Sequence, residues 1–401
     1  MIDINKIRKD FPIYDIQPKL AYLDSAASSL KVRSVIKQVD HYYMSLGVNV
    51  HRGAYELAYE ATKLYEDARI TVSKFIGAQE DEIIFTRGTT SALNLIAHAY
   101  KEILKPGDEI ITSELEHHSS LLPWMVVAKK TGAKLIYIPL TKEGRITVEG
   151  FKSVLTNQTK VVAITHVSNV MGYKTPIEEI ARLAHEKEAI VILDAAQSVP
   201  HMEVNVKELG VDFLAFSGHK MFGPSGVGVL YGKENLLNSI EPFEFGGEMA
   251  DQVFKDHATY KEAPLKFEAG TPVISGAIGL AEAIRYIESI GIHEIHEHTH
   301  QLHQYTLDKL KNVEGVTIYN PTADNPVIAF NVDDVHPHDI ATMLDQYNIS
   351  VRAGHHCAQL VTKFLGVNST LRASFHVYNN IADCDTFIDS VKAAKEFFLS
   401  F

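Results

Sequence analysis

The chain has 401 residues, 38 of them basic and 50 acidic, which gives a formal net charge of −12. This length favours two domains, and 46% hydrophobic with 22% charged residues is typical of a soluble globular protein. The acidic balance argues against binding to nucleic acid or to an anionic membrane. Because no apolar stretch could span a bilayer and the N-terminus has no apolar signal core, we expect a cytoplasmic protein.

Short apolar runs alternate with helical patterns through the first two thirds of the chain. The runs are almost continuously apolar, as is typical of strands that are buried on both faces of a mostly parallel sheet. Helical patterns such as the one at 91–104 separate them, so the sequence predicts an α/β domain with helices covering the sheet. The seven expected strands are 82–86, 109–112, 134–139, 161–165, 190–193, 213–216 and 226–231.

After about residue 270 the alternation of apolar runs with helical patterns ends. Two long helical patterns, 276–290 and 292–311, precede expected strands at 316–319, 327–332 and 371–377 and a closing helix. This order is typical of a smaller α+β domain with its own core. We therefore predict a large domain at 16–270 and a small domain at 271–401, with residues 1–15 packed on the small one.

Polar side chains follow two of the expected strands. The strand at 190–193 runs into Asp194, and Gln197 follows three residues later. Ligands of open α/β sheets bind beyond the carboxyl ends of strands. A carboxylate there can pair with the protonated ring nitrogen of pyridoxal 5′-phosphate (PLP) and keep the ring an electron sink. Taken alone, Asp194 is more simply a cap of a helix or turn.

The motif FSGHKMFGPSGVG, at 216–228, follows a second strand and places Lys220 in a tight loop. A lysine held there suits Schiff-base chemistry, because burial near cationic groups lowers the pKa of an amine. Ser217 and His219 offer hydrogen-bond donors to a phosphate. A solvated surface lysine is the alternative, but Asp194, 26 residues upstream at the end of a neighbouring strand, favours a cofactor site.

Two further motifs follow strands. In TRGTTSALN, at 86–94, Thr89 and Thr90 open a helix, and free backbone N–H groups with hydroxyl donors suit a phosphate dianion. Threonine is also an ordinary N-cap, so this signal is weak alone. In SELEHHSS, at 113–120, the imidazole of His117 could stack on a pyridine ring and move protons. Metal ligation is the alternative, but adjacent histidines diverge too much to share one metal.

Together these motifs resemble those of group II (SufS-type) cysteine desulfurases, in the class V aminotransferase family of fold-type I PLP enzymes. The resemblance runs from about Phe11 to the last helix. It is carried by YLDSAAS, NVHRG, FTRGTT, EHH, SNVMG, DAAQ, FSGHK, FEAGTP, VRAGHHCAQ and RASFHVYN. The family converts L-cysteine to L-alanine and holds the sulfur as a persulfide for transfer to an acceptor in iron–sulfur cluster assembly.

The resemblance implies a role for each matching residue. Lys220 is similar to the Schiff-base lysine, Asp194 to the pyridinium partner and Gln197 to the donor to the phenolate oxygen. His117 resembles the stacking, proton-handling histidine. The implied phosphate ligands are Thr90, Ser217 and His219, together with Thr271 donated by the other subunit of a homodimer. The implied substrate-carboxylate ligands are Asn169 and Arg372, with Arg352 as a further active-site arginine.

Cys357 lies in RAGHHCAQ, a loop with histidines on its N-terminal side. Nearby imidazolium or arginine charge would favour the nucleophilic thiolate, and the resemblance makes Cys357 the persulfide-forming cysteine. A buried structural thiol is the alternative. The second cysteine, Cys384, lies in an amphipathic helical pattern where inert packing is expected, and the absence of a CxxC pair suits a reducing compartment.

Two histidine-rich segments remain. In DVHPHD, at 334–339, His338 matches the histidine that serves a zinc-bearing SufU partner in one branch of the family, although HPHD also works as a helix start. The acceptor is therefore expected to be SufU-like or SufE-like. At 293–303, four histidines share one helical face, which we interpret as solvated rather than metal-binding. They are His293, His296, His300 and His303. We predict no metal site.

The sequence departs from the family pattern at positions near the expected active-site mouth or dimer interface. These are Tyr55, Glu56, Ser119, Ser120, Tyr173, Val273 and Leu360. None removes a catalytic group, but they leave the acceptor and the exact substrate open. The alternatives are selenocysteine lyase activity, another class V activity such as a kynureninase-like hydrolase or an epimerase, and a non-catalytic scaffold. Cys357 argues against the second, and the intact motif residues argue against the third.

Overall fold

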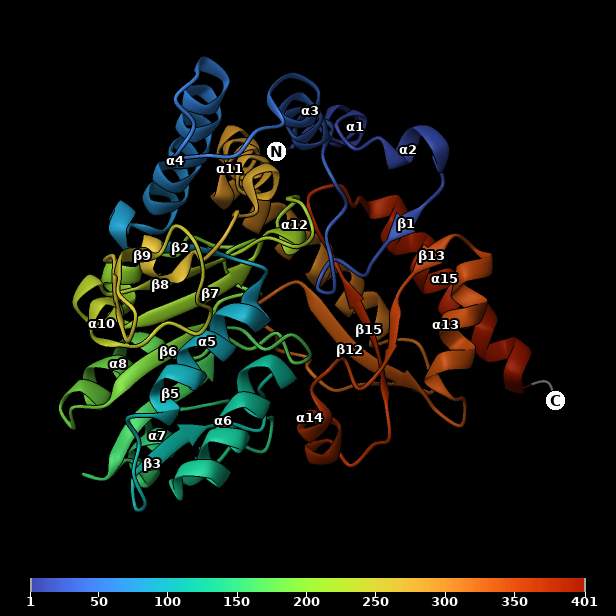
Figure 1. Cartoon of the computed structure of the whole chain (residues 1–401). Coiled ribbons are helices and arrows are strands. Elements are labelled where there is room, and N and C mark those ends of the chain that lie inside the picture. The colour runs from blue at the N-terminus through green and yellow to red at the C-terminus, as the bar shows by residue number, and fades with distance from the viewer. Residues whose placement is uncertain (1, 400–401) are drawn as a thin grey trace.

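The computed structural model describes residues 2–399, and all seven strands expected in the first two thirds of the chain form one sheet. Its strand order is β2-β8-β7-β6-β5-β3-β4 (Figure 1). Only β8 runs antiparallel to its neighbours, so the expected mostly parallel sheet is confirmed. The strands are β2 (Ile83–Thr86), β3 (Glu109–Thr112), β4 (Lys134–Tyr137), β5 (Thr159–Thr165), β6 (Ile190–Asp194), β7 (Phe213–Ser217) and β8 (Gly228–Gly232).

Successive residues of each strand bury their side chains in two different cores. Val161 and Ile192 join the cluster that contains Trp124. Their neighbours Val162 and Val191 join a second cluster on the other face. Because side chains alternate across a strand, this two-sided burial explains why the strands read as continuously apolar. The covering helices are α4 (Glu56–Ile76), α5 (Thr89–Lys101), α6 (His118–Thr131), α7 (Val148–Val154), α8 (Ile177–His185), α9 (Val206–Leu209), α10 (Glu234–Ser239) and α11 (Ile274–Ile290).

A second, antiparallel sheet lies beside the first, with strand order β11-β12-β15-β14 (Figure 1). Its apolar residues form a third cluster with those of the C-terminal helices. This region matches the α+β pattern expected after residue 270. Its elements are β11 (Val316–Ile318), β12 (Val327–Val332), β14 (Arg352–Gly354), β15 (Thr370–Ser374), α12 (Ile292–Leu310), α13 (Pro337–Gln346), α14 (Gln359–Phe364) and α15 (Ile381–Leu399).

The N-terminal segment packs on this second region. Strand β1 (Ala21–Tyr22) pairs in parallel with β13 (Ile349–Ser350). Arg8 forms an ion pair with Asp383 and donates to the carbonyl of Tyr378. The boundaries of the two domains stay a prediction. The remaining N-terminal elements are α1 (Ile4–Lys9), α2 (Ile13–Ile16), α3 (Arg33–His41) and a π-helical turn at Tyr42–Leu46.

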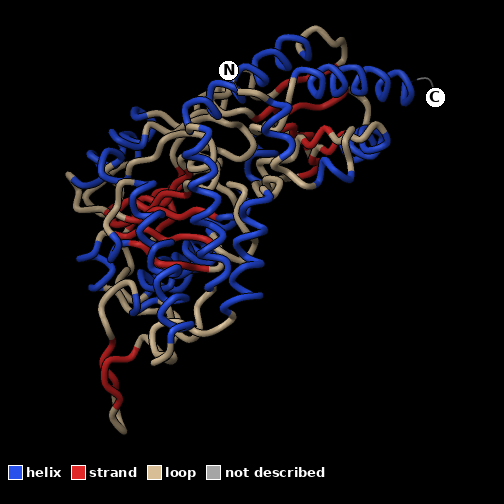
Figure 2. The backbone as a smooth tube through the Cα atoms, turned by 90° about the horizontal axis from the view of Figure 1, so that it is seen from above, coloured by secondary structure: helices blue, strands red, loops and turns tan. Residues whose placement is uncertain are grey.

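A two-stranded hairpin, β9 (Ala250–Val253) with β10 (Ala258–Tyr260), projects from the body of the molecule (Figure 2). Most of its residues are exposed. Short 3-10 turns occur at Glu80–Glu82, Gly218–Lys220 and Leu265–Phe267. Within residues 2–399, none of the helices has both the length and the apolar character that crossing a membrane requires.

Candidate active site

The carboxyl ends of three parallel strands meet at one cavity of about 220 Å³. Thr165 ends β5, Asp194 ends β6 and Ser217 ends β7. This is where open α/β sheets bind their ligands. Every predicted site residue except Thr271 and His338 lines it. Those residues are Thr89, Thr90, His117, Asn169, Asp194, Gln197, Ser217, His219, Lys220, Arg352, Cys357 and Arg372.

Lys220 ends the 3-10 turn that follows β7 and lies at this cavity. Burial lowers the pKa of its amine to about 8, with Asp194 opposing the shift and Arg372 adding to it. An amine with that pKa is partly neutral near physiological pH and is therefore a better nucleophile and base than a solvated lysine. The structure thus places Lys220 in the environment that Schiff-base chemistry requires.

The residue before Lys220 is anchored by the N-terminal segment. The carbonyl oxygen of His219 accepts hydrogen bonds from the backbone N–H of Ser29 at 2.9 Å and from its Oγ at 3.1 Å. Oγ of Ser28 donates to the same oxygen at 3.0 Å, and Nζ of Lys31 donates at 2.9 Å. Burial lowers the pKa of Lys31 to about 8. Four donors on one carbonyl fix the peptide that precedes Lys220, and no pattern in the sequence predicts this relationship.

Asp194 and His117 have the shifted acidity of buried groups. Burial raises the pKa of Asp194, and Lys220 opposes the rise. Burial lowers the pKa of His117 to about 4, helped by Lys220. Nδ1 of His117 accepts the backbone N–H of Ser119 at 3.1 Å and lies 2.6 Å from its Oγ. Since Nδ1 is an acceptor, the neutral ring carries its proton on Nε2.

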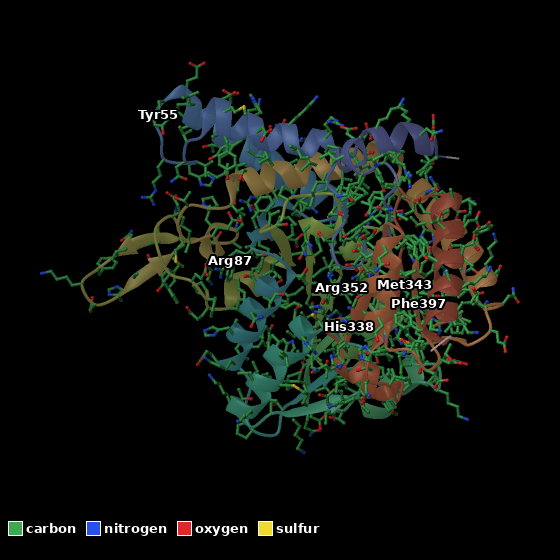
Figure 3. All side chains as sticks on the ribbon, turned by 90° about the vertical axis from the view of Figure 1, so that its right-hand side faces the viewer. Tyr55, Arg87, His338, Met343, Arg352 and Phe397 are labelled. Atoms are coloured by element: carbon green, nitrogen blue, oxygen red, sulfur yellow. The ribbon has the colours of Figure 1, made fainter. Side chains whose placement is uncertain are left out.

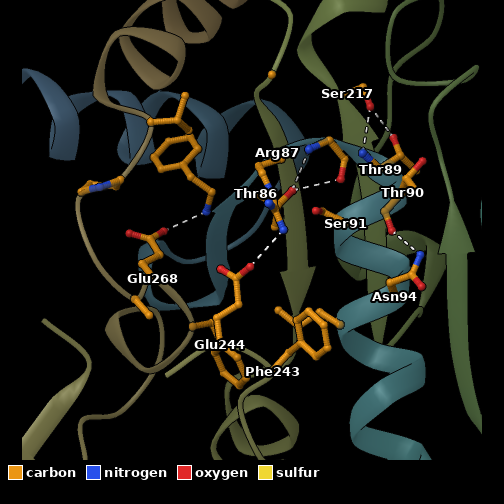
Figure 4. Close-up of a pocket in the computed structure, with 18 of the residues that line it drawn as sticks. Thr86, Arg87, Thr89, Thr90, Ser91, Asn94, Ser217, Phe243, Glu244 and Glu268 are labelled. Atoms are coloured by element: carbon orange, nitrogen blue, oxygen red, sulfur yellow. Dashed lines mark hydrogen bonds and ion pairs between the residues drawn. The ribbon is translucent and has the colours of Figure 1, made fainter. Parts of the chain in front are cut away.

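The expected phosphate end lies at the start of α5. The backbone N–H of Thr89 donates to Ser217 Oγ at 2.8 Å, and the two hydroxyl oxygens are 2.7 Å apart (Figure 4). A Cβ atom on Gly228 would lie 2.4 Å from Cα of Gly88, so only glycine allows β8 to pass this loop so closely. Helix-terminal N–H groups and hydroxyls fit a phosphate, as the sequence predicts.

The two arginines share Asp24, a residue in the YLDSAAS motif to which we had assigned no role. Arg372 donates to Asp24 Oδ1 at 3.0 Å and to the carbonyl of Asn169 at 3.0 Å. Arg352 Nε donates to Asp24 Oδ2 at 3.1 Å. Nε of Arg372 and Oδ1 of Asn169 are buried and have no protein partner among residues 2–399. A buried arginine beside the cavity whose Nε still lacks a partner fits a ligand that carries a carboxylate.

Gln197 is partly committed within the protein. Its Nε2 donates to the carbonyl of Ala26 at 2.8 Å. Each amide nitrogen has two protons, so one N–H is left for the phenolate oxygen of the cofactor. The predicted role of Gln197 is therefore compatible with the contact to Ala26.

Cys357 sits on a strained reverse turn and is exposed. His356 and Cys357 have φ of 51° and 55°, and the N–H of Ala358 donates to the carbonyl of His355 at 2.8 Å. This is a type I′ turn, which costs about 1–2 kcal/mol for each non-glycine residue with positive φ. Burial lowers the pKa of His356 to about 3, so this histidine is neutral and does not supply the cation that we expected beside the thiol. Lys220 and Arg372 are the cations that interact with Cys357.

Two predicted site residues lie outside the cavity. Thr271 lines an adjacent cavity of about 810 Å³, and Asn49 donates to its hydroxyl at 3.3 Å. The loop that carries Thr271 is held by Glu268, which pairs with buried Arg69 (Figure 4 shows Glu268). His338 is exposed at the start of α13, where a Cβ atom on Gly354 would lie 3.9 Å from its Nε2 (Figure 3). The roles assigned to both residues stay predictions.

The histidine face of α12 is solvated only at its N-terminal end, where His293 is exposed, so our interpretation is wrong for its C-terminal end. His303 is fully buried, and His296 stacks on His300 with ring centroids 6.0 Å apart. The face packs inward because α12 covers the second sheet. No group of three or more metal-ligating side chains is gathered anywhere in residues 2–399.

The departures from the family pattern are spread over the molecule. Tyr55 is exposed, whereas Tyr173 is buried under the guanidinium of Arg145, 3.9 Å from its ring centroid. Val273 lines the 810 Å³ cavity. Leu360 lies in α14 beyond the Cys357 turn, and Ser120 is buried in α6. Ser119, which lines the active cavity, is the departure with the most direct contact to a predicted catalytic residue.

A mostly parallel seven-stranded sheet, with a buried lysine after β7 and a buried aspartate at the end of β6, defines a PLP-dependent enzyme of fold type I. The chain belongs to the class V aminotransferase family, whose model, "Aminotransferase class-V", matches residues 21–387. Enzymes of this family use PLP, and the cavity described above has the residues to hold it.

Curated relatives and solved structures agree with this assignment. A "Probable cysteine desulfurase" from Halalkalibacterium halodurans is 51% identical, and the alignment covers 99% of both chains. A Staphylococcus aureus protein with the same name is 49% identical over 99% of this chain and 98% of its own. The apo structure of a cysteine desulfurase from Thermococcus onnurineus superposes with a TM-score of 0.95 at 44% identity over 99% of each chain. The Escherichia coli cysteine desulfurase CsdA gives 0.93 at 37% identity over the same share.

Proposed function

We propose that this protein is a cysteine desulfurase, which converts L-cysteine to L-alanine and holds the sulfur as a persulfide on Cys357. The observation that carries the proposal is that an exposed cysteine lines the same cavity as Lys220, Asp194 and Arg372. A PLP enzyme that did not move sulfur would have no need of a thiol there. The full-length similarity to proteins named cysteine desulfurase supports this function.

PLP, when bound, supplies an electron sink that stabilises negative charge on the substrate carbon. Asp194 would hold the ring nitrogen protonated, and Gln197 would donate its free N–H to the phenolate oxygen. The hydroxyls of Thr89, Thr90 and Ser217, with His219, would hold the phosphate at the start of α5. Lys220, with its lowered pKa of about 8, would bind the cofactor and then act as the base at Cα.

The substrate carboxylate would bind Arg372, whose buried Nε lacks a protein partner, with Arg352 and Asn169 beside it. This places the substrate between the cofactor site and Cys357. Burial lowers the pKa of His117 to about 4, so its ring is neutral near physiological pH and is a proton acceptor rather than an acid. We infer that the neutral ring of His117 takes up the thiol proton of the substrate and gives that proton up again only in a later step.

The sulfur step balances without any outside oxidant. The Cys357 thiolate attacks the substrate sulfur and forms an S–S bond, while the bond between that sulfur and Cβ breaks. The electron pair stays on the carbon skeleton, where protonation completes alanine. The persulfide on Cys357 then awaits an acceptor.

The finer assignments belong to the same proposal. We propose a cytoplasmic homodimer in which Thr271 serves the partner subunit's phosphate site, and a SufU-like or SufE-like acceptor that leads toward iron–sulfur cluster assembly. The exposed His338 next to β14 is a candidate contact for a zinc-bearing acceptor. His338→Ala should then slow transfer to such an acceptor and leave sulfide release to a small-molecule reductant unchanged.

The test is the release of alanine and sulfide from L-cysteine plus reductant by the PLP-loaded protein. We expect activity in the wild type, loss of activity in Cys357→Ala and in Lys220→Ala, and near-normal activity in Cys384→Ala. Cys384 is the matched control because it is buried in α15, where burial raises the pKa of its thiol to about 12. Equal activity in wild type and Cys357→Ala would reject the persulfide, and comparison with L-selenocysteine would separate the lyase alternative.

A further inference from the structure

The turn that carries Cys357 has an unfavourable backbone, so neighbouring contacts must hold it in place. Both central residues, His356 and Cys357, have positive φ. A turn of this kind relaxes to ordinary backbone angles when nothing opposes the change. The position of the thiol therefore depends on the groups that restrain the residues on either side of it.

On its N-terminal side the turn is held by two groups. Nε2 of the buried His356 lies 2.8 Å from Thr370 Oγ1. Nδ2 of Asn169 donates to the carbonyl of His356 at 2.8 Å. Both contacts act on the residue before Cys357, whereas on the other side Ala358 is held by packing in the main core.

On its C-terminal side the turn is also held by hydrogen bonds of one residue, His118. The backbone N–H of His118 donates to the carbonyl of Cys357 at 2.7 Å. Its ring Nε2 accepts the backbone N–H of Gln359 at 3.2 Å. His118 begins α6, which covers the large sheet, whereas Gln359 begins α14 after the turn, so the two bonds tie elements 241 residues apart in the chain.

The thiol of Cys357 lies at the boundary between the active-site cavity and a neighbouring groove. Cys357 lines the 220 Å³ cavity with Lys220, and it also lines a groove of about 530 Å³ together with His118. His118 does not line the cavity itself. In the proposed function, Cys357 takes sulfur from the substrate in the cavity and passes it to an acceptor that approaches through the groove. The thiol can do both only if the turn keeps it at the boundary between the cavity and the groove.

We propose that His118 is a positioning residue whose ring holds the Cys357 turn, through Gln359, at the boundary between the cavity and the groove. This inference rests on the proposed function and adds to it. Without the ring acceptor, the N–H of Gln359 loses the bond that ties it to α6, and the turn relaxes. The sulfur atom then spends less time within reach of the substrate, although the cofactor site is unchanged.

The test compares three PLP-loaded variants. His118→Phe keeps a ring but removes the acceptor, and His118→Gln returns an acceptor oxygen at a similar distance from the backbone. Leu122→Ala is the matched control, because Leu122 lies on the same helix and lines the same groove without contacting the turn in any hydrogen bond. Each protein is assayed for kcat and KM of alanine formation and for the rate at which iodoacetamide alkylates Cys357.

We expect His118→Phe to lower kcat by roughly ten- to a hundredfold with KM for cysteine within about twofold, because the misplaced group is the nucleophile and not the substrate site. Alkylation should become several times faster, and His118→Gln should restore most of both values. Because Cys384 is buried, the alkylation rate reports Cys357 alone. A kcat and an alkylation rate equal to those of the wild type in His118→Phe would overturn the proposal. So would the loss, in that variant, of the absorbance change that cysteine produces in the bound cofactor, because the proposal leaves the cofactor site unchanged.

Failure of the proposed function would look different. Alkylation of Cys357 needs no turnover. Its rate therefore reports whether His118 restrains the Cys357 turn even if none of the proteins makes alanine from cysteine. If His118→Phe fails to fold, His118→Asn takes its place, since its shorter amide does not reach Gln359. For His118→Asn we expect the same changes in kcat, KM and alkylation rate as for His118→Phe, and the same results would overturn the proposal.

Discussion

Oγ of Ser119 lies 2.6 Å from Nδ1 of His117, and the hydroxyl of Thr90 donates to the same Oγ at 3.0 Å. Three side chains therefore form a line from the expected phosphate end of the site to the proton-handling ring. If the hydroxyl of Thr90 donates its hydrogen bond to a phosphate instead, the hydroxyl of Ser119 can still donate to Nδ1 of His117. The hydroxyl of Ser119, one of the departures from the family pattern, supports the neutral ring in this protein.

Ser119→Ala should raise the pKa of His117 by up to about one pH unit, because one hydrogen bond to its unprotonated nitrogen is worth about 0.5–1.5 kcal/mol. The acid limb of the profile of kcat against pH should move to higher pH by that amount. Ser119→Thr, which keeps the hydroxyl, should leave the profile in place. Coincident profiles for wild type and Ser119→Ala would show that the contact has no effect on the ring.

Glu116 precedes His117 and is fully buried, and burial raises the pKa of its carboxyl to about 8. The unfolded chain loses this proton near the ordinary value of 4.5, whereas the folded protein keeps it to about pH 8. Between these values the unfolded state binds fewer protons, so the free energy of unfolding falls as pH rises, by up to about 1.4 kcal/mol per pH unit. Glu116→Gln should remove this component.

The measurement is urea unfolding of both proteins from pH 5 to pH 8. The stability of Glu116→Gln relative to wild type should rise across that window, whatever its value at pH 5. A constant difference would mean that Glu116 does not hold a proton in the folded state. The lowered pKa values of buried histidines add a slope of the opposite sign, but that slope is common to both proteins and cancels in the difference.

The buried pair of Arg69 and Glu268 anchors the loop that leads to Thr271. Two guanidinium nitrogens each donate to one oxygen of Glu268 at 2.9 Å, and both side chains are 3% exposed. Arg69→Met leaves the carboxylate buried without its partner and should lower the free energy of unfolding by about 3–5 kcal/mol. The same change at Arg182, whose ion pairs are exposed, should have little effect. Equal stability of the two variants would contradict the importance of the buried pair.

Lys31→Met removes one of the four donors on the His219 carbonyl. The loop before Lys220 should become less restrained, so we expect PLP to dissociate about tenfold faster or more and kcat to fall by a similar factor, as one hydrogen bond from a charged group is worth about 1.5–3 kcal/mol. Lys37→Met, on exposed helix surface nearby, is the control. Cofactor loss is followed by absorbance after dilution, and identical rates would place Lys31 outside the support of Lys220.

The large sheet could be predicted because its strands are buried on both faces, and its strand β3 begins and ends at the predicted residues. The hairpin of β9 and β10 could not, since its mostly exposed residues have no apolar alternation. Lys220 and Asp194 could be predicted because each follows an apolar run closely, and such a local pattern can be recognised in the sequence alone. The contacts from Asp24 to Arg372 and from Lys31 to His219 join residues more than 180 positions apart, and no local pattern encodes them.

The cavity draws on nearly the whole length of the polypeptide, from the Ala26 end of the chain to Arg372. A growing chain lacks the turn that carries Cys357 and the arginine that meets Asp24 until Arg372 has been added. A truncated product could retain the strands and lysine of the large sheet, yet it would have no thiol to receive sulfur. The proposed persulfide could therefore form only after the residues up to Arg372 have been added and have folded.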